Sequence, residues 1–164
     1  MNRRIKAMAL LGLAVVFATA VPQIGFAQSN PLFNSLIGTW KLDLAKSTFS
    51  PGVGPRSQTI TYEAEGQALR ATVETVDAQG GATKVALTLH NDGKYYPVRT
   101  PFYDAAADKV VNNTTVWAFR TKAGKVVQTL IGEVSGDGKT STVTTVGVAQ
   151  IGQPLYNVAV YERQ

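Results

Sequence analysis

Turn-forming residues interrupt this chain at short, regular intervals, and the segments between them alternate apolar and polar side chains. The clearest turns are Asn91-Asp92-Gly93 and Asp137-Gly138, because tight hairpin turns favour residues that accept a positive φ. Leu69, Ala71 and Val73 alternate with polar neighbours, which is typical of a strand with one buried face. No stretch after residue 27 shows a helical period. The pattern predicts strands near 37–44, 57–64, 68–77, 82–90, 94–99, 109–112, 114–121, 125–134, 139–148 and 155–163.

About ten such strands would leave exposed edges in a flat sheet, and closure into a barrel removes those edges. We therefore expect an all-β fold, a single antiparallel up-and-down β-barrel of about eight to ten strands. A two-sheet β-sandwich is the alternative. The segment 46–56 joins the first two predicted strands and is rich in Pro and Gly. It predicts a stiff loop, which either covers one barrel mouth with Phe49 packed against the barrel or forms a plain connection.

The first 27 residues have the composition of a secretory signal peptide. Arg3, Arg4 and Lys6 precede an apolar run over 7–21, and Gly25-Phe26-Ala27 supplies the small residues that a signal peptidase reads. The run is shorter than the ~20 residues that span a bilayer, so we expect no stable membrane insertion after signal removal. Removal would leave one β-barrel domain over 28–164, periplasmic or secreted. The paired arginines leave twin-arginine export open beside Sec export.

Composition argues against several classes of function. The chain has 16 Lys and Arg against 11 Asp and Glu, but three of those cations lie in the signal peptide and the others are scattered. We therefore expect no nucleic-acid partner. There is no cysteine, and His90 is the lone histidine, so the chain lacks a thiol nucleophile and the usual zinc ligands. His90 has no paired serine, and no two acids are spaced for acid/base chemistry. We expect no catalytic residue, no metal, no cofactor and no enzyme activity.

Both ends of the predicted domain resemble a known superfamily. The run from Ile37 to Leu42, with its Gly-x-Trp, resembles the opening strand of the calycins, the lipocalins and fatty-acid-binding proteins. The closing run from Val160 to Arg163 is similar to the last strand of intracellular fatty-acid-binding proteins. The resemblance implies that the Trp40 indole closes one end of the barrel. It also implies that only Tyr161 of the family's carboxylate-binding pair is present, because Ala159 stands where the family has arginine.

The segment between the first two strands also departs from that family. The two-helix lid of the fatty-acid-binding proteins is replaced by the Pro- and Gly-rich loop. The run over 46–52 is similar to a group of short exported bacterial lipocalin-like proteins of unknown function. The resemblance therefore implies a barrel more directly than it implies a fatty-acid ligand.

We expect the barrel to bind a small apolar or amphipathic molecule in its interior, without catalysis. Such pockets combine apolar walls with a few polar groups, and Tyr161 with Arg163 would meet an anionic head group through charge-assisted hydrogen bonds. A solvated Arg163, or one stacked over Trp40, is the alternative. The predicted ligand-binding residues are Tyr62, Trp117, Phe119, Tyr161 and Arg163. The predicted apolar wall is Leu42, Ile60, Val73, Leu87 and Trp117.

A filled barrel is the other interpretation of the same residues. The protein would then be an interaction module, such as a periplasmic adaptor or an enzyme inhibitor with an unknown protein partner. Its contacts would use the outer surface or the four aromatic side chains between Tyr95 and Tyr103. A continuous internal cavity favours the ligand binder, and a packed interior favours the interaction module.

Overall fold

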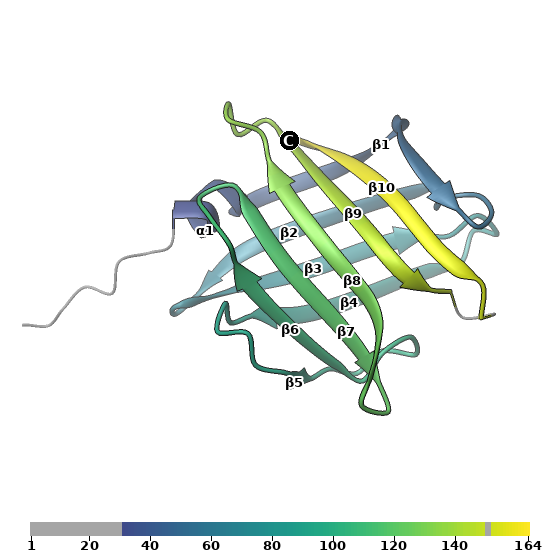
Figure 1. Cartoon of the computed structure of the whole chain (residues 1–164). Coiled ribbons are helices and arrows are strands. Elements are labelled where there is room, and N and C mark those ends of the chain that lie inside the picture. Colours follow the sequence, from purple (N-terminus) through teal and green to yellow (C-terminus); the bar gives the residue numbers. More distant parts are fainter. Residues whose placement is uncertain (1–30, 150–151) are drawn as a thin grey trace, which may run out of the picture.

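The computed structural model describes residues 31–149 and 152–164, which form one short helix and ten strands (Figure 1). The predicted signal peptide, 1–27, lies outside the described residues. The elements are α1 (Pro31–Leu36), β1 (Gly38–Ser50), β2 (Ser57–Glu65), β3 (Ala68–Val76), β4 (Ala82–Leu89), β5 (Tyr96–Pro97), β6 (Ala105–Val110), β7 (Thr115–Lys122), β8 (Lys125–Val134), β9 (Thr140–Val148) and β10 (Pro154–Arg163).

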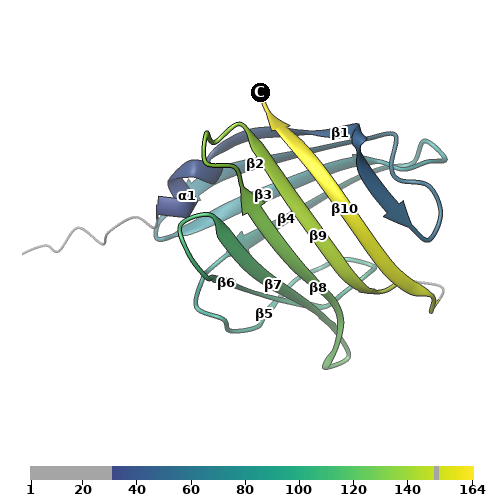
Figure 2. The same ribbon diagram turned by 45° about the horizontal axis from the view of Figure 1, so that its top comes forward.

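All ten strands of the described residues belong to one antiparallel sheet, in the order β4-β3-β2-β1-β10-β9-β8-β7-β6-β5. The first and last strands pair with each other, with Trp40 opposite Arg163 and Leu42 opposite Tyr161. The sheet curls so that β2–β4 lie behind β7–β10 and cross their direction (Figures 1 and 2). The expected all-β antiparallel barrel is confirmed. The sandwich alternative is wrong, because one continuous sheet forms both walls.

The two end strands of the sheet, β4 and β5, are not neighbours in a ladder. Side-chain bonds join this seam between β4 and β6. The Asp108 carboxylate on β6 accepts the backbone N–H groups of His90 at 3.1 Å and of Asn91 at 2.6 Å. The Asn91 side-chain oxygen accepts the N–H of Val110, and Asn91 has a φ of 58°, a conformation that Asn tolerates better than most residues. A buried acid and a turn residue thus hold the barrel together at the seam.

The strand β1 is longer than its sequence predicts. The alternation ends near residue 44, yet β1 continues to Ser50 after a register shift between Asp43 and Thr48. Such a bulge bends a strand and turns its following part in a new direction. The second part pairs with β10, with Phe49 opposite Asn157. The expected loop over 46–56 is therefore wrong for 46–50, and the irregular segment begins at Pro51.

Two further elements differ from the expectation. The helix α1 was not predicted, because its six residues make fewer than two turns and show no period. It is stabilised by packing, since Leu32, Phe33 and Leu36 are 0%, 6% and 4% exposed. The strand β6 begins at Ala105 instead of 109, because three alanines carry little strand propensity. None of the helices in 31–149 and 152–164 is long and apolar enough to span a membrane.

Candidate functional site: an interior cavity

The curled sheet encloses a cavity of about 450 Å³. Its wall is formed by the inward faces of the strands from both layers, together with α1 and the segment after β1. Three of the predicted wall residues, Ile60, Val73 and Leu87, line this cavity. Leu42 is buried in the core beside Tyr161 but lies outside the cavity wall. Phe49 near the end of β1 also lines the cavity, and so do Pro51 and Val53. The segment after β1 therefore contributes to one side of it.

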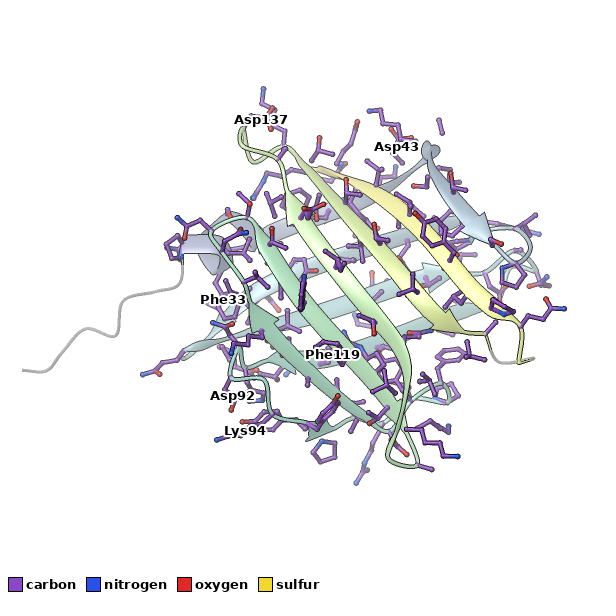
Figure 3. The ribbon with its side chains drawn as sticks, in the orientation of Figure 1. Phe33, Asp43, Asp92, Lys94, Phe119 and Asp137 are labelled. Carbon is purple, nitrogen blue, oxygen red and sulfur yellow. The ribbon has the colours of Figure 1, made fainter. Side chains whose placement is uncertain are left out.

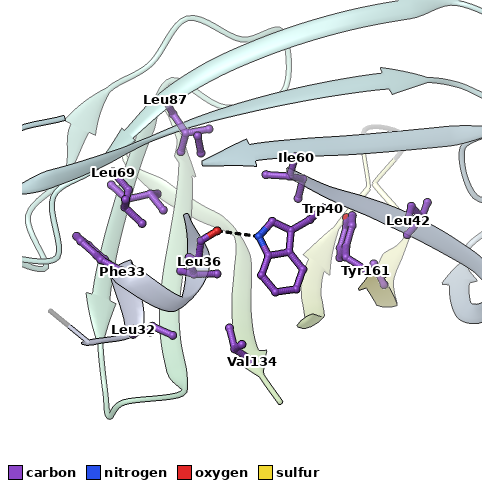
Figure 4. Close-up of a cluster of buried hydrophobic side chains, with 13 residues drawn as sticks. Leu32, Phe33, Leu36, Trp40, Leu42, Ile60, Leu69, Leu87, Val134 and Tyr161 are labelled. Atoms are coloured by element: carbon purple, nitrogen blue, oxygen red, sulfur yellow. Dashed lines mark hydrogen bonds between the residues drawn. The ribbon is translucent and has the colours of Figure 1, made fainter. Parts of the chain in front are cut away.

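One end of the barrel, here called the α1 end, is filled by α1 and the indole of Trp40 (Figure 4). Trp40 is 1% exposed, and its Nε1–H donates to the backbone oxygen of Leu36 at 2.7 Å. Leu32, Leu36 and Val134 belong to the same buried cluster. The indole therefore fastens the helix across the barrel and contributes apolar area there.

Arg163 belongs to the α1 end and does not line the cavity. Its guanidinium donates to the backbone oxygens of Ser35, of Ile37 at 2.7 Å and of Gly138 at 2.8 Å. It also lies 4.4 Å from the ring centroid of Trp40. A Cβ on Gly38, whose φ is 126°, would lie 3.1 Å from Arg163 Nη1, so glycine makes room for this contact. The placement of Arg163 in the ligand site is wrong, and the stacked alternative is confirmed.

Tyr62 and Tyr161 both line the cavity, as predicted. The Tyr161 hydroxyl donates to Gln58 Oε1, and Gln58 Nε2 donates to Thr75 Oγ1 at 2.7 Å. Burial raises the pKa of Tyr62 to about 12, against an opposing effect of the Arg120 charge. Burial also raises the pKa of Tyr161. Both phenols are therefore neutral near pH 7 and act as hydrogen-bonding groups in the wall. Ligand binding by these two tyrosines stays a prediction.

Trp117 and Phe119 lie on the outer face of the barrel, where Figure 3 labels Phe119 on β7. The inward residues of β7 are Val116, Ala118 and Arg120, and successive side chains of a strand point to opposite faces. Trp117 is accordingly 47% exposed. The prediction that Trp117 and Phe119 line the interior is wrong. Alternation shows that the two rings share a face, but not which face the barrel encloses.

Arg120, a cation in the cavity wall, was not predicted as a site residue. It is 7% exposed, and its Nη1 donates to the backbone oxygen of Phe119 at 3.0 Å. Its guanidinium carbon lies 5.4 Å from the ring centroid of Tyr103, which also lines the cavity. The available signal was its shared alternation with Val116 and Ala118, which places a charge among small inward residues.

Asp108 is the one acid that lines this cavity within the described residues. It is 5% exposed, and burial raises its pKa, while the amide donors at the seam and the charge of Arg120 oppose that rise. His90 stacks on Tyr96 with ring centroids 3.8 Å apart. The described residues contain no group of three or more His, Cys, Asp or Glu placed to hold a metal ion. The absence of enzyme activity stays a prediction.

The aromatic segment between Tyr95 and Tyr103 is divided between surface and cavity. Tyr95 is 49% exposed and Phe102 is 40% exposed. The Tyr96 hydroxyl donates to Asp92 Oδ2 at 2.7 Å, and Tyr103 lines the cavity. The four rings therefore do not form one surface patch.

Comparison with known proteins identifies the architecture. No family model matches the chain, and no curated protein matches it. The zebrafish ileal bile acid-binding protein, solved in complex with cholic acid, is similar with a TM-score of 0.51 and 11% identity, over 79% of this chain and 99% of that chain. This chain has the calycin fold. The siderocalin Ex-FABP is similar with a TM-score of 0.44 and 12% identity, over 79% of this chain and 74% of that chain. At 11% identity the similarity to the zebrafish protein concerns the fold alone.

Proposed function

We propose that this protein is a small exported barrel that binds an apolar or amphipathic molecule in its interior and performs no catalysis. The observation that carries the proposal is the cavity of about 450 Å³ on the inward face of the sheet. Sites for small ligands commonly occupy ~300–1,000 Å³ and combine apolar walls with few polar groups. A filled barrel, the basis of the alternative, would leave no such space.

The wall supplies both parts of an amphipathic site. Ile60, Leu87 and Leu130 offer apolar surface, and removing ligand surface from water contributes ~25 cal/mol per Å². Tyr62 and Arg120 offer polar contacts in the same wall. The similar zebrafish protein is a bile acid-binding protein, solved with cholic acid, which supports an amphipathic occupant for a barrel of this fold.

The proposed site of action is the periplasm or the external medium. Support comes from the basic start, the apolar run over 7–21 and the small residues before Gln28. Fractionation of the native host, followed by amino-terminal sequencing of the isolated protein, tests this part. A mature chain that begins at Gln28 in the exported fraction is the expected result, and a full-length cytoplasmic chain contradicts it.

The ligand proposal is tested by native mass spectrometry with organic extraction, on mature protein purified from its own host. We expect an additional mass that solvent releases. The cavity-filling variant Ala159→Trp should lose that mass, because Ala159 is 7% exposed and lines the cavity. The matched control is Trp117→Arg, on the outer face, which should keep it. A mass retained in both variants would place the ligand elsewhere.

Ala159→Trp must first be shown to fold, by circular dichroism and a cooperative thermal transition. Ala118→Phe, on β7 in the same cavity wall, is the second cavity-filling variant if Ala159→Trp does not fold. An unmodified protein mass, together with no uptake of added lipophiles, would rule out the binder.

An interaction module is the second candidate, and the outer face of β7–β10 favours it. Trp117, Val146 and Tyr156 are 47%, 41% and 51% exposed there. Exposed apolar patches of this kind often mark contacts with other molecules. The same two variants distinguish the candidates, because Trp117→Arg alters this face and leaves the cavity wall unchanged.

A further inference from the structure

We propose that Arg120 binds the negatively charged group of the ligand, so that the occupant of the cavity is an anionic amphipath. This inference rests on the proposed function, since it assigns chemistry to the same cavity. Its basis is a buried cation that has no counter-ion in contact among residues 31–149 and 152–164.

The environment of Arg120 is costly for a charge. Its residue is 7% exposed, and a buried cation needs an ion partner and hydrogen bonds to offset the loss of water. Within the described residues, its guanidinium makes one hydrogen bond, to the Phe119 carbonyl at 3.0 Å. No carboxylate of these residues lies within 4.0 Å of it.

Asp108 is not in contact with the guanidinium as its counter-ion. Its two carboxylate oxygens accept the backbone N–H groups of His90 and Asn91 at the seam. The charges of Asp108 and Arg120 affect each other, but the carboxylate makes no hydrogen bond to the guanidinium. Asp108 therefore offsets part of the cost through space and leaves the guanidinium donors unused.

Those unused donors open onto the cavity. Within the described residues, no fully buried side-chain nitrogen or oxygen lacks a hydrogen-bond partner. The remaining N–H groups of Arg120 must therefore be accessible, and Arg120 lines the cavity. A guanidinium presents its donors as a planar fork that fits a carboxylate, sulfonate or phosphate.

The position of Arg120 also suggests how the ligand lies. Along β7 the inward residues are Val116, Ala118 and Arg120, and Val116 packs against the buried cluster of the α1 end. Four residues of strand separate Val116 from Arg120 by ~13 Å. An apolar body extending toward Val116 and Leu36 would place the anion at the Arg120 donors that face the cavity, beside the contact of the guanidinium with the Tyr103 ring.

Two fluorescent probes with the same aromatic body test the charge requirement. Anilinonaphthalene sulfonate carries one sulfonate, and N-phenylnaphthylamine is its neutral counterpart. In Arg120→Met, we expect the affinity for the sulfonate probe to fall about 10- to 100-fold, the range for losing hydrogen bonds to a charged group. The affinity for the neutral probe should change less than about threefold. Arg120→Lys should give an intermediate loss, because it keeps the charge without the fork.

The matched control is Lys122→Met, which removes one cation from the same strand at an exposed position, where Lys122 donates to the Pro101 carbonyl. It should leave both affinities unchanged. Ala159→Trp should abolish binding of both probes and so show that they occupy the cavity. If Arg120→Met fails to fold, Arg120→Lys and Arg120→Gln provide the same comparison.

The outcomes separate the two proposals. If both probes bind and Arg120→Met weakens neither, or weakens both alike, Arg120 does not recognise charge and this inference is overturned while the binder stands. If neither probe binds the wild-type protein, both the proposed ligand-binding function and the anion site at Arg120 are contradicted.

Discussion

Two arginines of this barrel lie among apolar side chains, and their surroundings differ. Arg163, at the α1 end, donates to three backbone oxygens and covers the Trp40 ring. Arg120, in the cavity wall, donates to one backbone oxygen and faces open space. The first guanidinium joins the end of β10 to α1, to Ile37 just before β1 and to the turn between β8 and β9. Among the residues that the structure describes, the second makes no side-chain hydrogen bond beyond its own strand.

The contrast separates a structural cation from an available one. A guanidinium whose N–H groups donate to backbone carbonyls stabilises the fold and has few free donors for a ligand. A guanidinium with unused donors keeps the desolvation cost of its buried charge, which lowers the stability of the folded protein until a ligand binds. Stability and binding measurements should therefore respond oppositely at the two sites, and the following variants test that difference.

The largest effect is expected for Trp40→Ala at the α1 end. Trp40 is 1% exposed and its Nε1–H holds the Leu36 carbonyl. Removing the ring leaves a cavity beside α1 and an unstacked Arg163, so the free energy of unfolding should fall by about 3–5 kcal/mol. Urea denaturation of the purified barrel measures it. Trp40→Phe is the control and should recover part of the loss. A change below about 1 kcal/mol would mean that α1 does not depend on the indole.

Next in size is the difference between Arg163→Met and Arg120→Met. Arg163→Met leaves three carbonyls without their donor and should lower the free energy of unfolding by about 2–3 kcal/mol. Arg120→Met loses one such bond and removes a buried charge that has no carboxylate in contact with it, so it should change stability by less than about 1 kcal/mol in either direction. Urea midpoints of the two variants, compared with wild type, measure this difference. Equal losses would remove the distinction between the two arginines.

Asp108→Asn should show a smaller effect that depends on pH. The amide has one oxygen for the two N–H donors of His90 and Asn91, so a loss of about 1–2 kcal/mol is expected. Burial raises the pKa of Asp108 above its usual 3.8, so the folded protein holds the acid proton more tightly than the unfolded chain. Its contribution is therefore complete below pH 3.8 and decreases as pH rises through the raised pKa.

The stability difference between wild type and Asp108→Asn should accordingly narrow as pH rises from acid. The pKa values of Asp43, Asp92 and Asp137 are lowered by hydrogen bonds. These residues are unchanged in the variant, so their contributions to the pH dependence of stability cancel in the difference. Urea midpoints at several pH values above and below 3.8 provide the measurement. A difference that widens with pH would contradict a raised pKa for Asp108.

The sequence predicted the strands, which depend on local patterns, better than it predicted the contacts that form when the sheet closes into a barrel. Alternation and turn residues placed β2, β3, β4 and β8 within about two residues of their bounds, because their periodicity is local. The seam, the bulge in β1 and the contacts of α1 depend on residues far apart in the chain. The pairing of Arg163 with carbonyls before β1 likewise exists only after β1 and β10 meet.

The inward face of β7 shows why the site was harder to predict than the fold. Its two faces carry Val116, Ala118 and Arg120 on one side and Trp117 with Phe119 on the other. Hydrophobicity favours burying the aromatic face, but closure of the sheet encloses the smaller side chains and the arginine. A cavity that holds a ligand requires residues that do not fill it, and that requirement has no signal in a local pattern.

Trp117→Arg should give the smallest effect, and it tests the inside and outside of β7 directly. Trp117 is 47% exposed, so a long polar side chain there should change the free energy of unfolding by no more than about 0.5 kcal/mol. The affinity for the neutral naphthyl probe should stay within twofold of wild type, because Ala118 and Arg120 keep their positions in the wall. Urea denaturation and probe titration give both values. Loss of stability comparable to that of Trp40→Ala would mean that the indole is buried and the facing of β7 is reversed. That result would also remove Arg120 from the cavity, so this variant with the smallest expected effect tests the geometry on which the anion site depends.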